Sequence, residues 1–427
     1  MALPAPLGQE GYGKPVRRGW AGNMTTRTVD ATTEAAGPAA DMRVPQWAVA
    51  ALAAAALAGL CAAAWATTGR TLGLAVLIGA LAGVSLYHAA FGFTAGWRRF
   101  IRERRGAGLR AQFWLVGATA VIAMPLIGYG DLIGVRAWGY VFPVGIAVAV
   151  GAFMFGLGMQ LAGGCGSGTL FTVGGGSTRM VITLAFFIAG GLLATYHWVF
   201  WAGLPRLPAT SLARTLTPWG GVAVTLAVLA ALWALSRRAE WRAHGNYDAG
   251  RPFRSLWRGP WSPAVGVVGL TAVGGLTLAV LGRPWGITSG LTLWGAQIAH
   301  AAGVPVEAWP YWTNAMAAVE GSPLRDGTSA MNFGLIAGAT LAAGLAGHFR
   351  PTLALSTRDV LTAMAGGLLM GYGARIAFGC NIGAFLGGVA SGSLHGWLWL
   401  VLAFVGSIAG VWLRERIGVD PPRAAAH

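Results

Sequence analysis

The sequence predicts an all-α polytopic membrane protein with about ten spanning helices, short broken or re-entrant helices, and two inverted-topology repeats around a central pathway. Composition is the first observation: 55% of the 427 residues are hydrophobic, 10% are charged, and mean hydropathy is +0.60, whereas soluble domains average about 25% charged residues. The apolar residues also gather into long runs with arginines between them. Finally, two glycine-rich motifs recur in the same order in both halves of the chain.

The chain begins with a polar, Gly/Thr-rich segment, residues 1–45. This segment has no apolar stretch followed by a cleavage site, so we expect a disordered cytoplasmic tail and not a signal peptide. The net charge of +16 comes nearly all from arginine. Because these arginines lie between apolar runs, their pattern indicates membrane topology, and no nucleic-acid partner is expected.

Ten runs are long enough to span a bilayer, which needs about 20 apolar residues: 46–66, 71–91, 111–130, 140–160, 180–201, 219–235, 263–282, 329–347, 361–377 and 394–413. Three further stretches are too short or too glycine-rich to span, and we expect them to be broken or re-entrant: 161–177, 285–302 and 380–392. None of the acidic residues lies inside a run, which disfavours a carboxylate proton relay.

The arginine clusters indicate the orientation. They follow the second, sixth, eighth and tenth runs, and comprise Arg98, Arg99, Arg102, Arg104, Arg105 and Arg110, then Arg237, Arg238, Arg242, Arg251, Arg254 and Arg258, then Arg350 and Arg358, and finally Arg414 and Arg416. All of these positions fall on one side of the membrane. The positive-inside rule therefore predicts that both termini are cytoplasmic.

An internal repeat connects the two halves. "GLGMQLAGGCGSG" (156–168) and "GYGARIAFGCNIG" (371–383) share the pattern G-x-G-x-x-x-A-x-G-C-x-x-G, and "FGFTAG" (91–96) matches "WGITSG" (285–290). We expect a first repeat at 71–201 and a second at 263–413, with extra material at 304–328. The predicted topology runs the two repeats in opposite directions, and inverted repeats with discontinuous helices place a site near the membrane midplane.

The remaining segments complete the predicted organisation: 46–70 is an extra N-terminal helix, 202–262 is a linking helix with a cytoplasmic loop, and 414–427 is a cytoplasmic tail.

Three cysteines occur, without CxxC or metal-ligand spacing, so no metal, cofactor or disulfide framework is expected. Cys61 lies in an Ala-rich run outside the repeats, where we expect it to pack as a small apolar residue. Cys165 and Cys380 occupy equivalent positions, each after a glycine where a helix should break. A neutral S–H is a weak donor that suits a soft anion, whereas Lys or Arg would hold the anion too tightly.

The quoted motifs, together with "AGGCGSG", "ARIAFGCNIGAF", "SGSLHGW" and "EGSPLRDG", resemble the YeeE/YedE family of bacterial sulfur-compound transporters. The resemblance implies uptake of thiosulfate or a related small sulfur-containing anion across the bacterial inner (cytoplasmic) membrane, through a central constriction lined by cysteines. It also implies a cytoplasmic sulfur-carrier protein as a partner, besides the lipid bilayer. Family members commonly have Phe-Cys-Phe-Thr where this chain has Gly92 in Phe-Gly-Phe-Thr, and this departure affects the expected number of thiols and the substrate.

Backbone N–H groups at half-helix starts suit an anion, and the glycine strings at both breaks are denser than helix packing requires. Asn381 is expected to line the site or to cap the broken helix, and Arg375 either attracts anions or only snorkels to the interface. The predicted substrate-binding residues are Cys165, Cys380, Gly164, Gly166, Ser167, Gly379, Asn381, Gly92 and Gly286.

Alternatives to thiosulfate uptake are transport of a selenium or other sulfur species, a structural membrane subunit, and a membrane-bound sulfurtransferase that forms a persulfide on Cys165 or Cys380. A sulfurtransferase needs a base or cation that helps to ionise the thiol. The neighbours of Cys165 in sequence are glycine, serine and threonine, and the paired broken motifs disfavour a structural subunit. The sequence therefore favours transport over catalysis, so we expect no enzyme.

Overall fold

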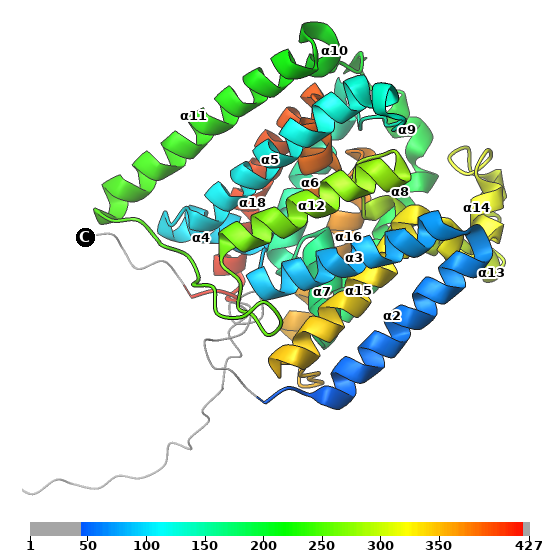
Figure 1. Ribbon diagram of the computed structural model, residues 1–427, viewed down its shortest axis with the longest axis horizontal. Helices are drawn as coiled ribbons and strands as arrows, with labels where there is room; N and C mark the ends of the chain where they lie inside the picture. The colour runs from blue at the N-terminus through cyan, green and yellow to red at the C-terminus, as the bar shows by residue number, and fades with distance from the viewer. Residues whose placement is uncertain (1–43, 422–427) are drawn as a thin grey trace, which may run out of the picture. The chain divides into compact units, whose positions relative to one another are not determined.

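The computed structural model describes residues 44–421, and this part of the chain is almost entirely helical (Figure 1). It contains ten helices long and apolar enough to cross a membrane, as the sequence predicts. They are α2 (Trp47–Thr68), α3 (Arg70–Ala89), α5 (Ala107–Tyr129), α6 (Ile146–Ala162), α8 (Thr178–Tyr196), α11 (Pro218–His244), α12 (Pro263–Leu281), α15 (Gly327–Ala346), α16 (Thr357–Ile376) and α18 (Leu394–Arg416).

Shorter helices fill the breaks between them. Those inside the two predicted repeats are α4 (Phe93–Glu103), α7 (Gly166–Gly174), α13 (Thr288–Ala301), the π-helix η4 (Asn381–Gly387) and α17 (Gly388–Ala390). Peripheral elements are η1 (Gly130–Ile133), α9 (Trp198–Ala202), α10 (Leu212–Leu216), η2 (Val306–Ala308), α14 (Met316–Glu320) and η3 (Pro323–Arg325). Strands β1 (Val144–Gly145) and β2 (Arg206–Leu207) form one antiparallel pair.

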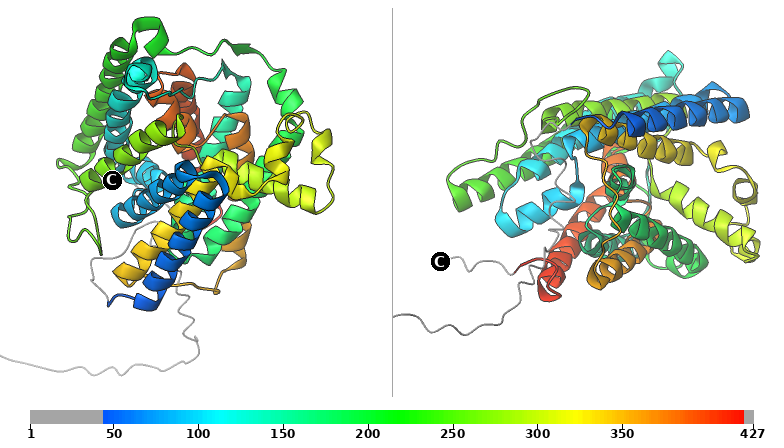
Figure 2. Two further views of the ribbon diagram at one scale, coloured as in Figure 1. Left: turned by 45° about the vertical axis from the view of Figure 1, so that its right-hand side comes forward. Right: turned by 90° about the horizontal axis from the view of Figure 1, so that it is seen from below.

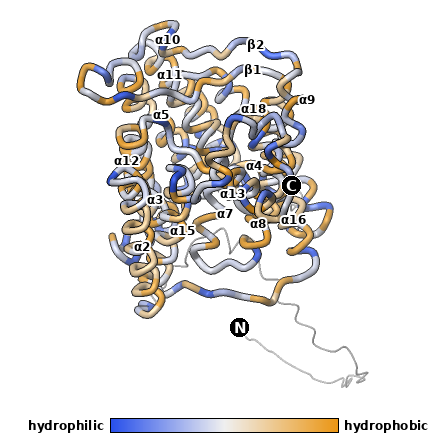
Figure 3. The backbone as a smooth tube through the Cα atoms, turned by 90° about the vertical axis from the view of Figure 1, so that its right-hand side faces the viewer, coloured by the Kyte–Doolittle hydropathy of each residue, from blue (hydrophilic) through white to orange (hydrophobic). Residues whose placement is uncertain are grey.

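The spanning helices divide into an inner group and an outer group. Inside, α3 packs along α15, α6 along α18 and α16, and α8 along α16. Outside, α2 lies against α3 and α15, and α11 lies along α5 (Figures 1 and 2). The outer helices keep apolar side chains exposed, such as Leu52 at 74%, and α2 and α12 are coloured mainly as hydrophobic in Figure 3. Such an apolar surface suits contact with lipid.

Glycine residues allow the inner helices to pack with their backbones in contact. A Cβ added to Gly83 of α3 would collide with the Leu335 carbonyl of α15, and one added to Gly338 would collide with the Ala80 carbonyl of α3. Small residues let membrane helices approach until their backbones touch. This accounts for many of the glycines outside the breaks.

The packing partners in the two halves correspond to each other. The contact between α3 and α15 corresponds to the contact between α12 and α5, and the contact between α6 and α18 corresponds to the contact between α16 and α8. In the same way, the contact between α15 and α7 corresponds to the contact between α5 and α17, and the contact between α4 and α18 corresponds to the contact between α13 and α8. A two-fold relation between 71–201 and 263–413 would produce such matched pairs. The opposite orientation of the two repeats stays a prediction.

The arginine-rich loops meet at one end of the helices. Arg99 Nη1 lies 2.5 Å from Asp248 Oδ2, joining the second loop to the sixth. Arg358 Nη1 donates to the Gly418 carbonyl at 2.6 Å, joining the eighth loop to the C-terminal segment. The start of α2 reaches the same end, since Gln46 Nε2 donates to the carbonyl of Phe349 in the eighth loop. The structure therefore places on one end the segments that the sequence assigns to one side.

Helix α4 was not among the elements expected from the sequence, which placed residues 98–110 in a loop. Its buried residues Phe93, Trp97 and Ile101 recur every four positions with arginines between them. This amphipathic pattern is that of a helix with one face in the core. A search for apolar runs of about 20 residues does not detect α4, because this segment is short and basic.

Helix α11 also continues beyond its predicted end at residue 235 as far as His244. It thereby buries Glu240 completely, with Oε2 accepting from Arg110 Nη1 at 2.5 Å and Oε1 lying 3.5 Å from Arg105 Nη1. The acid is buried at the arginine-rich end with two cations beside it, as burial of a carboxylate requires.

Candidate functional site

The first break separates α6 from α7. Gly163 has φ +88° and ends α6, and Cys165 is the N-cap of α7. The N–H of Gly168 donates to Cys165 Sγ at 3.4 Å, and Ser167 Oγ lies 3.5 Å from the sulfur. The thiol therefore sits at the positive end of a half-helix, where donors converge.

The second break separates α16 from η4. Phe378 has φ +60° and Gly379 φ +150°. A Cβ on Gly379 would lie 2.6 Å from the Ala384 nitrogen, so only glycine fits there. Cys380 then stands before the first residue of η4 and, unlike Cys165, accepts no capping hydrogen bond through its side chain. Both predicted thiols thus occupy the same kind of position.

The two breaks meet. A Cβ placed on Gly166 would lie 3.3 Å from Cys380 Sγ and 3.8 Å from Thr288 Cγ2 at the start of α13. The Cys380 sulfur therefore contacts the residue that follows Cys165, and both thiols are buried. Gly286 lies just before α13, and its Cβ would come within 3.0 Å of the Tyr140 hydroxyl.

Unpartnered polar groups surround this meeting point. Asn381 is completely buried, and neither its Oδ1 nor its Nδ2 has a hydrogen-bond partner. It therefore does not cap a helix end, and its role in lining the site stays a prediction. The buried hydroxyls of Thr94 and Thr169 also lack partners. A buried polar group without a partner costs about 1–3 kcal/mol, so these groups are disposed to bond a polar species that enters.

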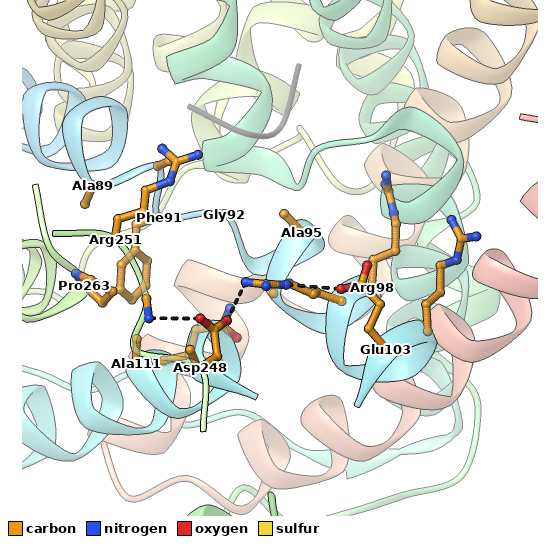
Figure 4. Close-up of a pocket in the computed structure, with 18 residues that line it drawn as sticks. Ala89, Phe91, Gly92, Ala95, Arg98, Glu103, Ala111, Asp248, Arg251 and Pro263 are labelled. Atoms are coloured by element: carbon orange, nitrogen blue, oxygen red, sulfur yellow. Dashed lines mark hydrogen bonds and ion pairs between the residues drawn. The ribbon is translucent and has the colours of Figure 1, made fainter. Parts of the chain in front are cut away.

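Two cavities approach Cys165 from the arginine-rich end. A small one of about 20 Å³ is lined by Cys165, Gly164, Gly92 and Ala95. A larger one of about 340 Å³ also has Gly92 and Ala95 in its wall (Figure 4). Gly92 therefore lies between the larger cavity and the Cys165 thiol.

The sequence did not indicate the arginine cluster at the C-terminal end of α6. Arg98 and Arg414 donate to the Gln160 carbonyl at 3.4 and 2.9 Å, and Arg179 donates to the Ala162 carbonyl at 2.6 Å. The three side chains are at most 5% exposed. Helix C-terminal carbonyls repel anions, so the cluster offsets the negative end of α6 beside Cys165. The only sequence signal is Arg179, a cation that starts an apolar run.

Of two other residues singled out by the sequence, Cys61 lies outside the breaks and Arg375 lies in the last turn of α16, just before the second break. Cys61 Sγ is 3.9 Å from the Gly73 carbonyl, at the contact between α2 and α3. The guanidinium carbon of Arg375 is 5.2 Å from the centre of the Tyr311 ring, and its buried Nε has no hydrogen-bond partner. Arg375 therefore stacks on an aromatic ring.

The fold and this site define a class: polytopic α-helical membrane proteins whose discontinuous helices meet through their N-termini, an arrangement found in secondary transporters. Residues 88–409 match the sequence profile of the family described as Sulphur transport, and the chain belongs to this family. The predicted resemblance to the YeeE/YedE proteins is thereby confirmed.

Individual relatives agree with this assignment. The thiosulfate transporter TsuA of Spirochaeta thermophila is 30% identical over 286 residues, covering 62% of this chain and 77% of the relative. TsuA of Escherichia coli is 27% identical over 373 residues, covering 82% and 96%. The "Probable transporter YedE" of Salmonella typhimurium is 33% identical over 161 residues, and the match covers 38% of this chain and only 39% of the relative's length.

Proposed function

We propose that this protein takes up thiosulfate, or a related sulfur-containing anion, across the bacterial cytoplasmic membrane through a constriction lined by Cys165 and Cys380. The observation that carries the proposal is the contact between the Cys380 sulfur and Gly166, the residue after Cys165. Two half-helix N-termini bearing one thiol each thereby share one point. The TsuA relatives, named as thiosulfate transporters, support the choice of substrate.

In this proposal the anion exchanges its water for weak donors in two steps. It meets the Cys380 thiol and the unpartnered Asn381 amide first, then the Cys165 thiol with the N–H groups around it. A neutral S–H binds a soft anion without a full charge, and weak sites in series allow release as well as entry. Inverted repeats supply the two equivalent sites, and the matched helix contacts of the two halves support them.

The arginine-rich end faces the cytoplasm in this proposal, so the anion leaves through the larger cavity beside Gly92. A cytoplasmic sulfur-carrier protein that receives the anion at this end belongs to the same proposal. The positive-inside rule supports the orientation, because the arginine-rich loops gather at that end.

A sulfurtransferase would move the sulfane sulfur of thiosulfate onto a cysteine thiolate and release sulfite. Arg179 lines the small cavity beside Cys165, so a cation is nearer than the sequence suggested. Its guanidinium is held by the Ala162 and Leu161 carbonyls and the Thr362 hydroxyl. No observation favours formation of a persulfide over transport of the intact anion.

The test is uptake of ³⁵S-labelled thiosulfate into vesicles containing the full-length protein, with sulfite, sulfate and selenosulfate as competitors. Transport predicts accumulation with both cysteines unmodified in the intact mass. A mass increase of one sulfur atom on Cys165 or Cys380, without accumulation, would replace transport by sulfurtransferase activity.

A further inference from the structure

We propose that the cavity bounded by Arg98 is a second, separate binding station that holds a small oxyanion or its sulfur analogue between the thiols and the arginine-rich face. The inference rests on the proposed function and adds a site outside the cysteine constriction. The cavity measures about 340 Å³ and is lined by α4, the start of α5 and residues 248–251 (Figure 4).

Arg98 supplies a buried charge to this cavity. Its side chain is 5% exposed, and among residues 44–421 no carboxylate oxygen lies within 4.0 Å of it. Arg98 Nε donates to the Gln160 amide oxygen at 3.0 Å, and Gln160 Nε2 donates to the Thr94 carbonyl at 3.3 Å. A neutral amide therefore fixes the guanidinium without neutralising it. Asp420 acts on Arg98 only from beyond ion-pair distance and is itself hydrogen-bonded to Arg414, whereas a buried cation normally has an anionic partner in contact.

Arginines outnumber acids in the wall of the cavity, although Arg102 is paired with Glu415 and Asp420, which lie outside the wall. Four arginines line it, against two acids: Arg98, Arg99, Arg102 and Arg251, with Glu103 and Asp248. Both acids pair with the same arginine, since Arg99 lies 3.3 Å from Glu103 and 2.5 Å from Asp248. Neither acid lies within ion-pair distance of Arg98.

The position of the cavity fits a station on the route of the anion. Gly92 and Ala95 belong both to its wall and to that of the Cys165 cavity, and in Figure 4 they lie between Arg251 and Arg98. The volume exceeds that of one liquid water, about 30 Å³, roughly tenfold. A small dianion fits with part of its hydration, which permits release. The ligand class is thus a hydrated anion of about −2 charge.

The most direct test offsets the positive charge of Arg98 with a neighbouring carboxylate and keeps the arginine in place. Gln160→Glu is isosteric, keeps an acceptor for Arg98 Nε, and places a carboxylate 3.0 Å from it. Arg98→Gln and Arg98→Lys complete the series. Arg358→Gln is the control, because Arg358 lies at the same arginine-rich end, where it donates to the Gly418 carbonyl, but does not line the cavity.

The first readout is independent of transport. A cysteine introduced at Ala95, in the Cys61→Ala background, is treated with an anionic and a cationic methanethiosulfonate, and labelling at residue 95 is followed by peptide mass. We expect the ratio of anionic to cationic reaction rates to fall about tenfold in Gln160→Glu and Arg98→Gln. It should change less than twofold in Arg98→Lys, in Arg358→Gln, and for a cysteine at the exposed residue Ala209 in any background.

The second readout is thiosulfate uptake by the same folded variants, which should fall at least fivefold in Gln160→Glu and recover in Arg98→Lys. If wild-type protein takes up no thiosulfate but the labelling ratio depends on Arg98, the station exists and the proposed substrate is wrong. If wild-type protein transports while Gln160→Glu, folded by gel filtration, keeps the wild-type labelling ratio, the station is overturned and the proposed function stands.

Discussion

Cys380 Sγ lies against the backbone of Gly166, 3.3 Å from where a Cβ on that glycine would be. Residues 214 positions apart in the chain, the difference between 380 and 166, therefore meet where the two breaks come together. Any side chain at position 166 fills the space against the Cys380 sulfur.

Enlarging Gly166 should close this space. Gly166→Ala is expected to lower thiosulfate uptake several-fold and Gly166→Val to abolish it, because the added carbons occupy the contact with Cys380. Gly59→Ala is the control, since a Cβ there meets no atom within 4 Å and Gly59 lies on α2, outside the repeats. Uptake by Gly166→Val at the wild-type rate, with normal expression, would show that the anion does not pass this point.

The three cysteines should differ in importance. Cys165→Ala is expected to abolish uptake, and Cys380→Ala to reduce it less because Asn381 remains as a donor beside it. Cys61→Ala should leave uptake unchanged, since Cys61 lies between α2 and α3. Partial activity of Cys165→Ser would mean that a hydrogen-bond donor suffices, whereas no activity would mean that sulfur is required. Normal transport by Cys165→Ala would refute the proposed mechanism.

Gly92→Cys should fold and supply a third thiol. The nearest neighbour of a Cβ at Gly92 is the Ala95 Cβ at 3.6 Å, an ordinary contact, so the side chain fits. One further weak hydrogen bond of about 0.6 kcal/mol would lower KM for thiosulfate about threefold. Gly59→Cys, on the exposed face of α2, is the control. An unchanged KM would mean that the anion does not contact position 92.

The C-terminal segment should be sensitive to acid through Asp420. Burial raises the pKa of this carboxyl, but the paired hydrogen bonds from Arg414 at 2.7 Å and the charges of Arg414 and Arg98 outweigh burial and hold the pKa below its usual range. A lowered pKa contributes stability that is present above the unfolded value, about 3.9, and is lost as pH falls through the folded value.

Thermal unfolding of the detergent-solubilised protein between pH 3 and 7 tests this. The melting temperature of the wild type should fall below pH 4. Asp420→Asn should lose about 3 kcal/mol at pH 7, because Arg414 is left buried without its counter-charge, and should show a smaller decrease on acidification. Equal acid sensitivity of the two proteins would assign the effect to other groups.

Topology can be measured with reporter fusions. Alkaline phosphatase joined after Arg258 should be inactive, and the same enzyme joined after Ala209 should be active, because these positions lie on opposite ends of α11. The physical reason is the arginine content of the loops on one side. An active fusion after Arg258 would reverse the proposed orientation.

The sequence by itself determined the fold class, the ten spans and the positions of the three long breaks. These features depend on local properties: about 20 apolar residues per span, glycine where a helix stops, and a repeated motif around Cys165 and Cys380. The family followed from the same local motifs. The roles of the cysteines and the inversion of the repeats are predictions that the experiments above address.

Only the tertiary structure decided which residues meet. The contact of Gly166 with Cys380, the arginines on the α6 carbonyls and the amide that holds Arg98 join residues far apart in the chain. In sequence Arg98 and Arg414 belong to ordinary arginine-rich loops, and Gln160 is one polar residue at the end of an apolar run. In the folded protein these residues are buried, and a charge removed from water is stabilised only by the few groups around it. Those groups come from helices that pack together only in the folded protein.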